Sequence, residues 1–208
     1  MKRRELTALL AERPIVHPTR IEGLTWRGRQ LVLEVRGYRW WANAYEDRQA
    51  EETVSLVFSD VGNGRLRTDE LNPDDDEALD EFDIVPVADV PWAQGSDWSI
   101  YCSGPIGDPV ALFASVQDYL HRQGAFLGPE DFLNQAAELS AFTAMAQAAG
   151  FLVARGPACI RDLVCCELER QSVPHNVLST VADTEPRLLV RLGNSAFFCQ
   201  EALIELPD

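Results

Sequence analysis

The sequence predicts an α+β protein, in which an antiparallel β-sheet precedes a helical hairpin and a C-terminal β-α-β-β segment. Two patterns indicate this class. Short runs of alternating apolar and polar residues, separated by turn residues, occupy residues 14–102, which is typical of an antiparallel sheet forming a sandwich or partial barrel. After Ser103-Gly104-Pro105 the apolar residues recur with the period of a helix. We therefore separate a mainly β region, residues 1–105, from a helical and β region, residues 106–208, and expect both to pack as one unit.

The N-terminal region starts with a short amphipathic helix. Its apolar run after Arg4 is interrupted by Thr7 and closed by Glu12, whereas a secretory signal needs about 7–15 apolar residues. The alternating pattern predicts five strands, over residues 31–36, 38–42, 54–58, 84–87 and 98–102. Gly28 supplies the turn before the first strand, and Pro86 restricts the fourth to a sheet edge because proline donates no hydrogen bond.

The helical hairpin follows from capping signals and from the spacing of apolar residues. Asp108 is a good N-cap residue, and Pro109 suits the first helical position. One apolar stripe on this helix needs a surface to cover, and it consists of Leu112, Phe113, Val116, Tyr119 and Leu120. Gly124 ends the helix, and Pro129 opens a second helix that runs to Gly150 and packs antiparallel to the first.

The remaining residues predict the order β-α-β-β. A short strand at residues 151–154 precedes a helix that begins at Gly156-Pro157. The apolar face of this helix consists of Ile160, Leu163, Val164 and Leu168. Two strands, at residues 187–192 and 196–200, flank the hairpin turn Gly193-Asn194-Ser195.

Charge is concentrated in one stretch of the chain. Nine of the fifteen residues from Asp69 to Asp83 are acidic and none is basic, and we call these residues the acidic segment. The chain of 208 residues has 33 acidic and 18 basic side chains, so this segment supplies more than half of the net charge of −15. Clustered carboxylates repel phosphate and anionic lipid, which argues against a nucleic-acid or membrane partner.

The acidic segment has two main interpretations. Its run from Asn72 to Ala78 fails to match a calcium loop, because it has consecutive carboxylates, a proline and no glycine. A solvated loop is the simplest interpretation, and a surface that binds a basic protein is the functional one. The candidate partner-binding residues in the segment are Asp74, Asp75, Asp76, Glu77, Asp80 and Glu81.

Trp40 and Trp41 complete this candidate partner-binding set. Adjacent residues on a strand face opposite sides of the sheet, so we expect one ring in the core. The other ring is either covered by the C-terminal helices or exposed near Arg36 and Arg39. Tryptophan and arginine are enriched at interface hot spots, so an exposed ring would suit partner binding.

The alternative hypothesis is a small enzyme with a cysteine-based active site. Cys159 falls in the first turn of a predicted helix, where unpaired amides lower a thiol pKa, and His175 and Asp183 follow it. Core packing is the competing interpretation, because cysteine is often buried. Cys165-Cys166 and the three histidines lack the paired spacing of a zinc site, so no metal is predicted.

The sequence favours a non-catalytic protein over an enzyme. It contains no phosphate-binding loop, nucleophile elbow or dinucleotide fingerprint, and we predict no cofactor. No run approaches the roughly 18 apolar residues of a transmembrane helix. The five cysteines, an odd number without an export signal, favour the cytoplasm. We therefore expect an inhibitor, immunity-like or adaptor protein that binds a basic protein partner through its acidic surface.

Overall fold

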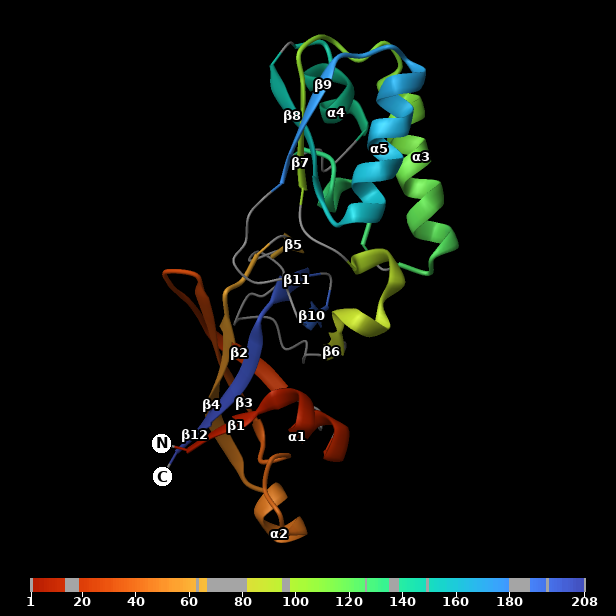
Figure 1. Ribbon diagram of the computed structural model, residues 1–208. Coiled ribbons are helices and arrows are strands. Elements are labelled where there is room, and N and C mark those ends of the chain that lie inside the picture. Colours follow the sequence, from red (N-terminus) through yellow and green to blue (C-terminus); the bar gives the residue numbers. More distant parts are fainter. Residues whose placement is uncertain are drawn as a thin grey trace. The chain divides into compact units, whose positions relative to one another are not determined.

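The protein has an α+β fold with antiparallel sheets, as predicted (Figure 1). The computed structural model describes residues 2–13, 19–62, 64–66, 82–94, 98–125, 127–134, 139–148, 150–179, 188–193 and 195–207. The chain forms two compact units: unit 1 consists of Met1–Pro86 and Pro186–Asp208, and unit 2 of Val87–Glu185. Unit 2 is therefore an insertion in the chain of unit 1. Packing of residues 1–105 and 106–208 as one cooperative unit stays a prediction.

Sheet A of unit 1 joins the two ends of the chain. Its strand order is β1-β12-β4-β3-β2, and every neighbouring pair is antiparallel. The strands are β1 (Lys2–Glu5), β2 (Thr19–Arg27), β3 (Gln30–Tyr38), β4 (Glu51–Ser59) and β12 (Glu201–Leu206). The predicted turn at Gly28 is confirmed: this residue connects β2 to β3 with a φ of +65°, a conformation that suits glycine. The β1–β12 pairing is a long-range contact that no local pattern indicated.

Sheet B of unit 1 has the strand order β5-β11-β10-β6. Its strands are β5 (Gly64–Arg65), β6 (Phe82–Pro86), β10 (Leu188–Leu192) and β11 (Ser195–Cys199). The predicted hairpin is confirmed, since β10 and β11 pair on either side of Gly193. The predicted edge strand is also confirmed, because β6 pairs only with β10 among the described residues. Pro86 is its last residue.

The core of unit 1 lies between one face of sheet A, sheet B and helix α1 (Leu6–Glu12). The rings of Phe58 in β4 and Phe197 in β11 meet edge to face, with centroids 5.2 Å apart. Other fully buried side chains in this core include Leu6, Leu9, Leu31, Leu33, Leu56 and Ile204. Removing this apolar area from water is the main favourable term for the unit, at about 25 cal/mol per Å².

The strand predicted over residues 38–42 is wrong. β3 ends at Tyr38, and the chain then turns, with Trp40 N donating to Tyr38 O and Ala42 N donating to Arg39 O. This turn brings Trp40 and Trp41 into the same core, where their rings pack edge to face at 5.2 Å. Adjacent residues point to opposite sides of a sheet only when they lie on a strand. Trp40 and Trp41 lie on a turn, so both rings can enter the same core. A one-turn helix, α2 (Tyr45–Arg48), follows.

Unit 2 consists of a three-stranded sheet and helices on one of its faces (Figure 1). Sheet C has the antiparallel order β8-β7-β9, with β7 (Trp98–Cys102), β8 (Phe151–Gly156) and β9 (His175–Ser179). α5 (Ala158–Arg170) packs on β7 and β8, and α3 (Pro109–Arg122) packs on α5. Asp108 caps α3 as predicted, since its Oδ1 accepts from Ala111 N at 2.9 Å. The short 3-10 turns are η1 (Val87–Asp89), η2 (Pro91–Ala93) and η3 (Pro129–Asp131).

The second helix predicted from Pro129 to Gly150 is wrong in its extent. Pro129 opens only η3, and α4 spans Leu139–Met145. Between them the main chain pairs with the edge of sheet C, where Asn134 N donates to Val153 O and Arg155 N donates to Phe132 O. Backbone pairing with β8 thus overrides the local helix signals at this point. α4 still packs on α3, and Phe113 lies 6.3 Å from Phe142 between ring centroids.

Candidate functional site

The acidic segment belongs to the connection between the two edge strands of sheet B. Most of the candidate partner-binding residues, Asp74, Asp75, Asp76, Glu77, Asp80 and Glu81, lie outside the described residues. The flanking strands are described: β5 pairs with β11, and β6 pairs with β10. Three strand spacings separate these edges, or roughly 14 Å. The carboxylates therefore belong to a connection whose two ends are fixed on one folded sheet.

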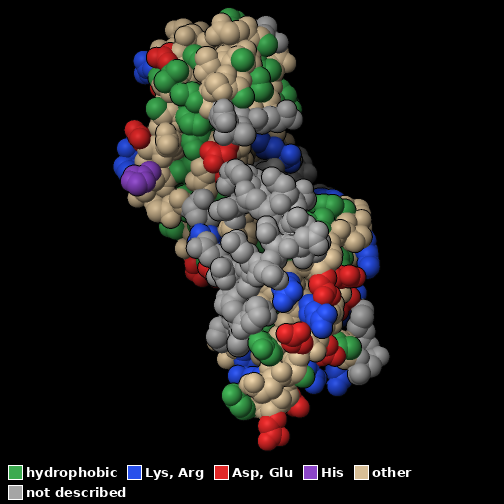
Figure 2. Space-filling view, turned by 180° about the vertical axis from the view of Figure 1, so that it is seen from behind, with side chains coloured by type: hydrophobic (Ala, Val, Ile, Leu, Met, Phe, Trp, Pro, Cys, Tyr) green, Lys and Arg blue, Asp and Glu red, His purple; other side chains and the backbone are tan. Residues whose placement is uncertain are grey.

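On the face of unit 1 that Figure 2 shows, acidic and basic side chains of the described residues are interspersed. Several form ion pairs, including Arg3–Glu205 at 2.6 Å between β1 and β12, and Arg39–Glu52 at 2.9 Å between the turn after β3 and β4. Without the acidic segment, the remaining 24 acidic residues exceed the 18 basic ones by only six. The excess negative charge is thus concentrated in the segment.

A shallow polar pocket of about 190 Å³ lies on unit 1, lined by Arg20, Glu22, Arg36, Gly37 and Glu51. Arg36 is 3.7 Å from Glu22 and 3.4 Å from Glu51. All three of these side chains are more than one third exposed. Water therefore screens the pairs strongly, and they contribute little to stability. The two arginines and two glutamates that line the pocket have equal and opposite charge, so the pocket offers no excess charge to a ligand.

Trp40 and Trp41 are not on the surface. Trp40 is 1% exposed and Trp41 is 4% exposed, so both rings are covered, and the alternative of one exposed ring is wrong. The cover comes from the core of unit 1 and not from the C-terminal helices. Arg13 donates to the main-chain oxygen of Trp41 at 2.7 Å, which ties the residue after α1 to this turn. Among the described aromatic residues, the exposed ones are instead Trp26, Tyr45 and Tyr101. No sequence pattern distinguished these three from the buried rings.

The environment of Cys159 is that of a packed thiol. Its Sγ donates to Trp92 O at 2.6 Å. Burial raises the pKa of the Cys159 thiol, although a hydrogen bond with Tyr119 acts in the opposite direction. Burial also raises the pKa of Tyr119 to about 12, with a further contribution from Cys159. The position at the start of α5 therefore does not produce the lowered pKa expected from the sequence, because desolvation dominates.

Cys159 and His175 lie at opposite ends of unit 2. Gly156, just before α5, pairs with Trp98 at one end of β7, whereas His175 pairs with Cys102 at the other end. α5 itself is about 20 Å long. His175 Nδ1 lies 3.0 Å from Val173 O, and Asp183 lies outside the described residues. The structure thus does not bring this cysteine and histidine within the hydrogen-bond reach that an activated thiol requires.

All five cysteines are free thiols. Burial raises the pKa of Cys102 to about 11 and that of Cys199 to about 12. Burial also raises the pKa of Cys165, whereas its neighbour Cys166 is exposed. A thiol with a raised pKa has little thiolate near neutral pH and is a poor nucleophile. These positions agree with structural rather than chemical roles.

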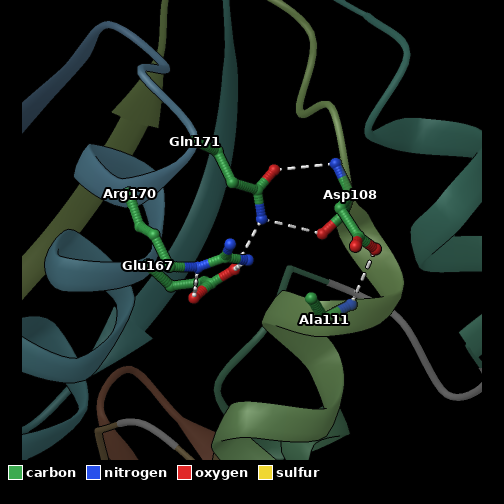
Figure 3. A network of polar contacts seen from close by, with 5 residues as sticks. All are labelled: Asp108, Ala111, Glu167, Arg170 and Gln171. Carbon is green, nitrogen blue, oxygen red and sulfur yellow. Dashed lines mark hydrogen bonds and ion pairs between the residues drawn. The ribbon is translucent and has the colours of Figure 1, made fainter.

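A polar network links the start of α3 to the end of α5 (Figure 3). Gln171 Oε1 accepts from Asp108 N at 2.7 Å, and Gln171 Nε2 donates to Asp108 O at 2.9 Å. The same Nε2 donates to Glu167 Oε1 at 2.7 Å. Arg170 donates twice to this carboxylate, at 2.8 and 2.5 Å. Hydrogen bonds from Arg170 are the main cause that lowers the pKa of Glu167. The local sequence indicates Asp108 as a cap, but it does not indicate the partner Gln171, which is 63 residues away.

The other face of sheet C carries exposed apolar side chains. Tyr101 is directly opposite Leu152 in the strand register, and Leu178 is opposite Ser99 on the same face. Leu178 is 56% exposed and Tyr101 is 38% exposed. β9 forms one edge of this sheet among the described residues. No charged residue occurs within His175–Ser179, so this edge lacks the lysine that often protects an edge strand.

In the described parts of the chain, no three His, Cys, Asp or Glu side chains are grouped closely enough to hold a metal ion. No described helix has the length and apolar character needed to span a bilayer. No protein-family model, curated protein or solved structure matches this chain.

Proposed function

We propose that this chain is a non-catalytic cytoplasmic protein that binds a basic protein partner through its acidic segment, in an inhibitor, immunity-like or adaptor role. The observation that carries the proposal is the composition of residues 69–83, with nine carboxylates and no basic residue. Such a cluster attracts a basic surface over about 8 Å at physiological salt. This attraction raises association rates by about 10- to 1,000-fold.

Two features of unit 1 support this function. The strands on either side of the acidic segment, β5 and β6, both belong to sheet B. Several charges on the described surface of the same unit form ion pairs, and outside the segment the acidic residues of the chain exceed the basic ones by only six, which leaves the segment as the main source of negative potential. A basic partner would therefore be attracted to the acidic segment rather than to the molecule as a whole.

The chemistry of the thiols supports a binding role more than a catalytic one. The pKa of Cys159 is raised by burial, and His175 is at the far end of sheet C. The five free cysteines also support a reducing compartment, since paired cysteines are typical of exported proteins. These observations favour the cytoplasm as the place of action.

Affinity capture with charge-matched variants tests the proposal. The test variant combines Asp74→Asn, Asp75→Asn and Asp76→Asn. The control combines Glu12→Gln, Glu46→Gln and Asp47→Asn, which are exposed residues of unit 1 outside the segment. Both variants change the net charge from −15 to −12. The immobilised proteins are incubated with cell extract at low salt and then eluted with increasing salt.

The proposal predicts that a basic protein is retained by the wild type and by the control but is eluted from the test variant at lower salt. If the two variants retain the same proteins up to the same salt concentration, the position of the charge has no effect. That result would contradict a specific role for the acidic segment.

A further inference from the structure

We draw no further inference here: the strongest candidate, the exposed apolar face of sheet C around Tyr101, Leu152 and Leu178 with the adjacent edge strand β9, has nothing in the described part of the structure to show what covers it.

Discussion

The side chain of Gln171 and the main chain of Asp108 exchange two hydrogen bonds, at 2.7 and 2.9 Å, and thereby join the end of α5 to the start of α3. Gln171 also binds Glu167, so that the three residues and Arg170 form one network (Figure 3). Gln171 thereby supplies an acceptor for the N–H of the N-cap residue Asp108, which has no acceptor within α3, and this is a structural role.

The first prediction concerns Glu167. Its pKa is lower in the folded state than in the unfolded state, where it is near 4.5, so the charged carboxylate stabilises the fold at pH values above 4.5. This stabilisation is lost as the pH falls through the folded-state pKa. Glu167→Gln should therefore reduce the free energy of unfolding by about 1 kcal/mol near pH 7. The difference between the wild type and the variant should shrink as the pH falls below 4.5, toward the folded-state pKa of Glu167. Urea unfolding at pH 7 and at a pH well below 4.5 measures this change.

Glu169→Gln is the matched control for this experiment, because Glu169 is exposed on the same helix. Its effect should be within about 0.5 kcal/mol of zero at both pH values. An equal loss for the two variants at pH 7, or a loss for Glu167→Gln that does not shrink at the lower pH, would show that the carboxylate of Glu167 does not act as described.

The second prediction concerns Gly64, the first residue of β5. A Cβ at this position would overlap the main-chain oxygen of Ala196 and the Cα of Phe197, and the φ of Gly64 is +147°. Gly64→Ala should therefore lower the free energy of unfolding by roughly 1–3 kcal/mol or more, because the main chain of β5 or β11 must move. Gly62→Ala is the control, since no heavy atom lies within 4 Å of its added Cβ. Thermal unfolding of both variants tests the close approach of β5 to β11.

The third prediction concerns the thiols. Under native conditions a thiol reagent should modify the exposed Cys166 first and the buried Cys102 and Cys199 only after unfolding. Mass spectrometry after short labelling times identifies the modified sites. Rapid modification of Cys159 near neutral pH that is suppressed by His175→Ala would instead support the cysteine-based enzyme.

The fourth prediction concerns cooperativity between the two regions of the chain. Phe142 is fully buried beside Phe113. Phe142→Ala should therefore lower the free energy of unfolding by about 3–5 kcal/mol, because apolar burial is lost and a cavity remains. Val110→Ala serves as a control, because Val110 is 50% exposed. If the chain forms one cooperative unit, calorimetry should show a single transition that shifts to lower temperature. A second transition that stays at the wild-type temperature would identify independent units.

Sequence reasoning succeeded where the cause of a structure is local. Asp108 and Pro109 start α3, and Gly28 and Gly193 connect hairpins, because each depends on residues a few positions away. The predictions were wrong where pairing with a strand distant in the sequence determines the local structure. Residues 132–134 carry helix signals but pair with β8.

The candidate sites follow the same division. The charge of residues 69–83 can be read from the sequence, but the attachment of their flanking strands to opposite edges of sheet B depends on β10 and β11, more than a hundred residues later. The burial of Trp40 and Trp41 depends on a turn after β3 that strand alternation could not indicate. The raised pKa of Cys159 arises from tertiary burial and not from its place at the start of α5.

The most direct test of the proposed function is the association rate constant with the captured basic partner, measured by stopped-flow at increasing salt. The variant Asp74→Asn, Asp75→Asn, Asp76→Asn should associate more slowly than the wild type at low salt and show a weaker salt dependence. The control variant Glu12→Gln, Glu46→Gln, Asp47→Asn should remain close to the wild type. Equal association rates for all three proteins at every salt concentration would contradict steering by the acidic segment.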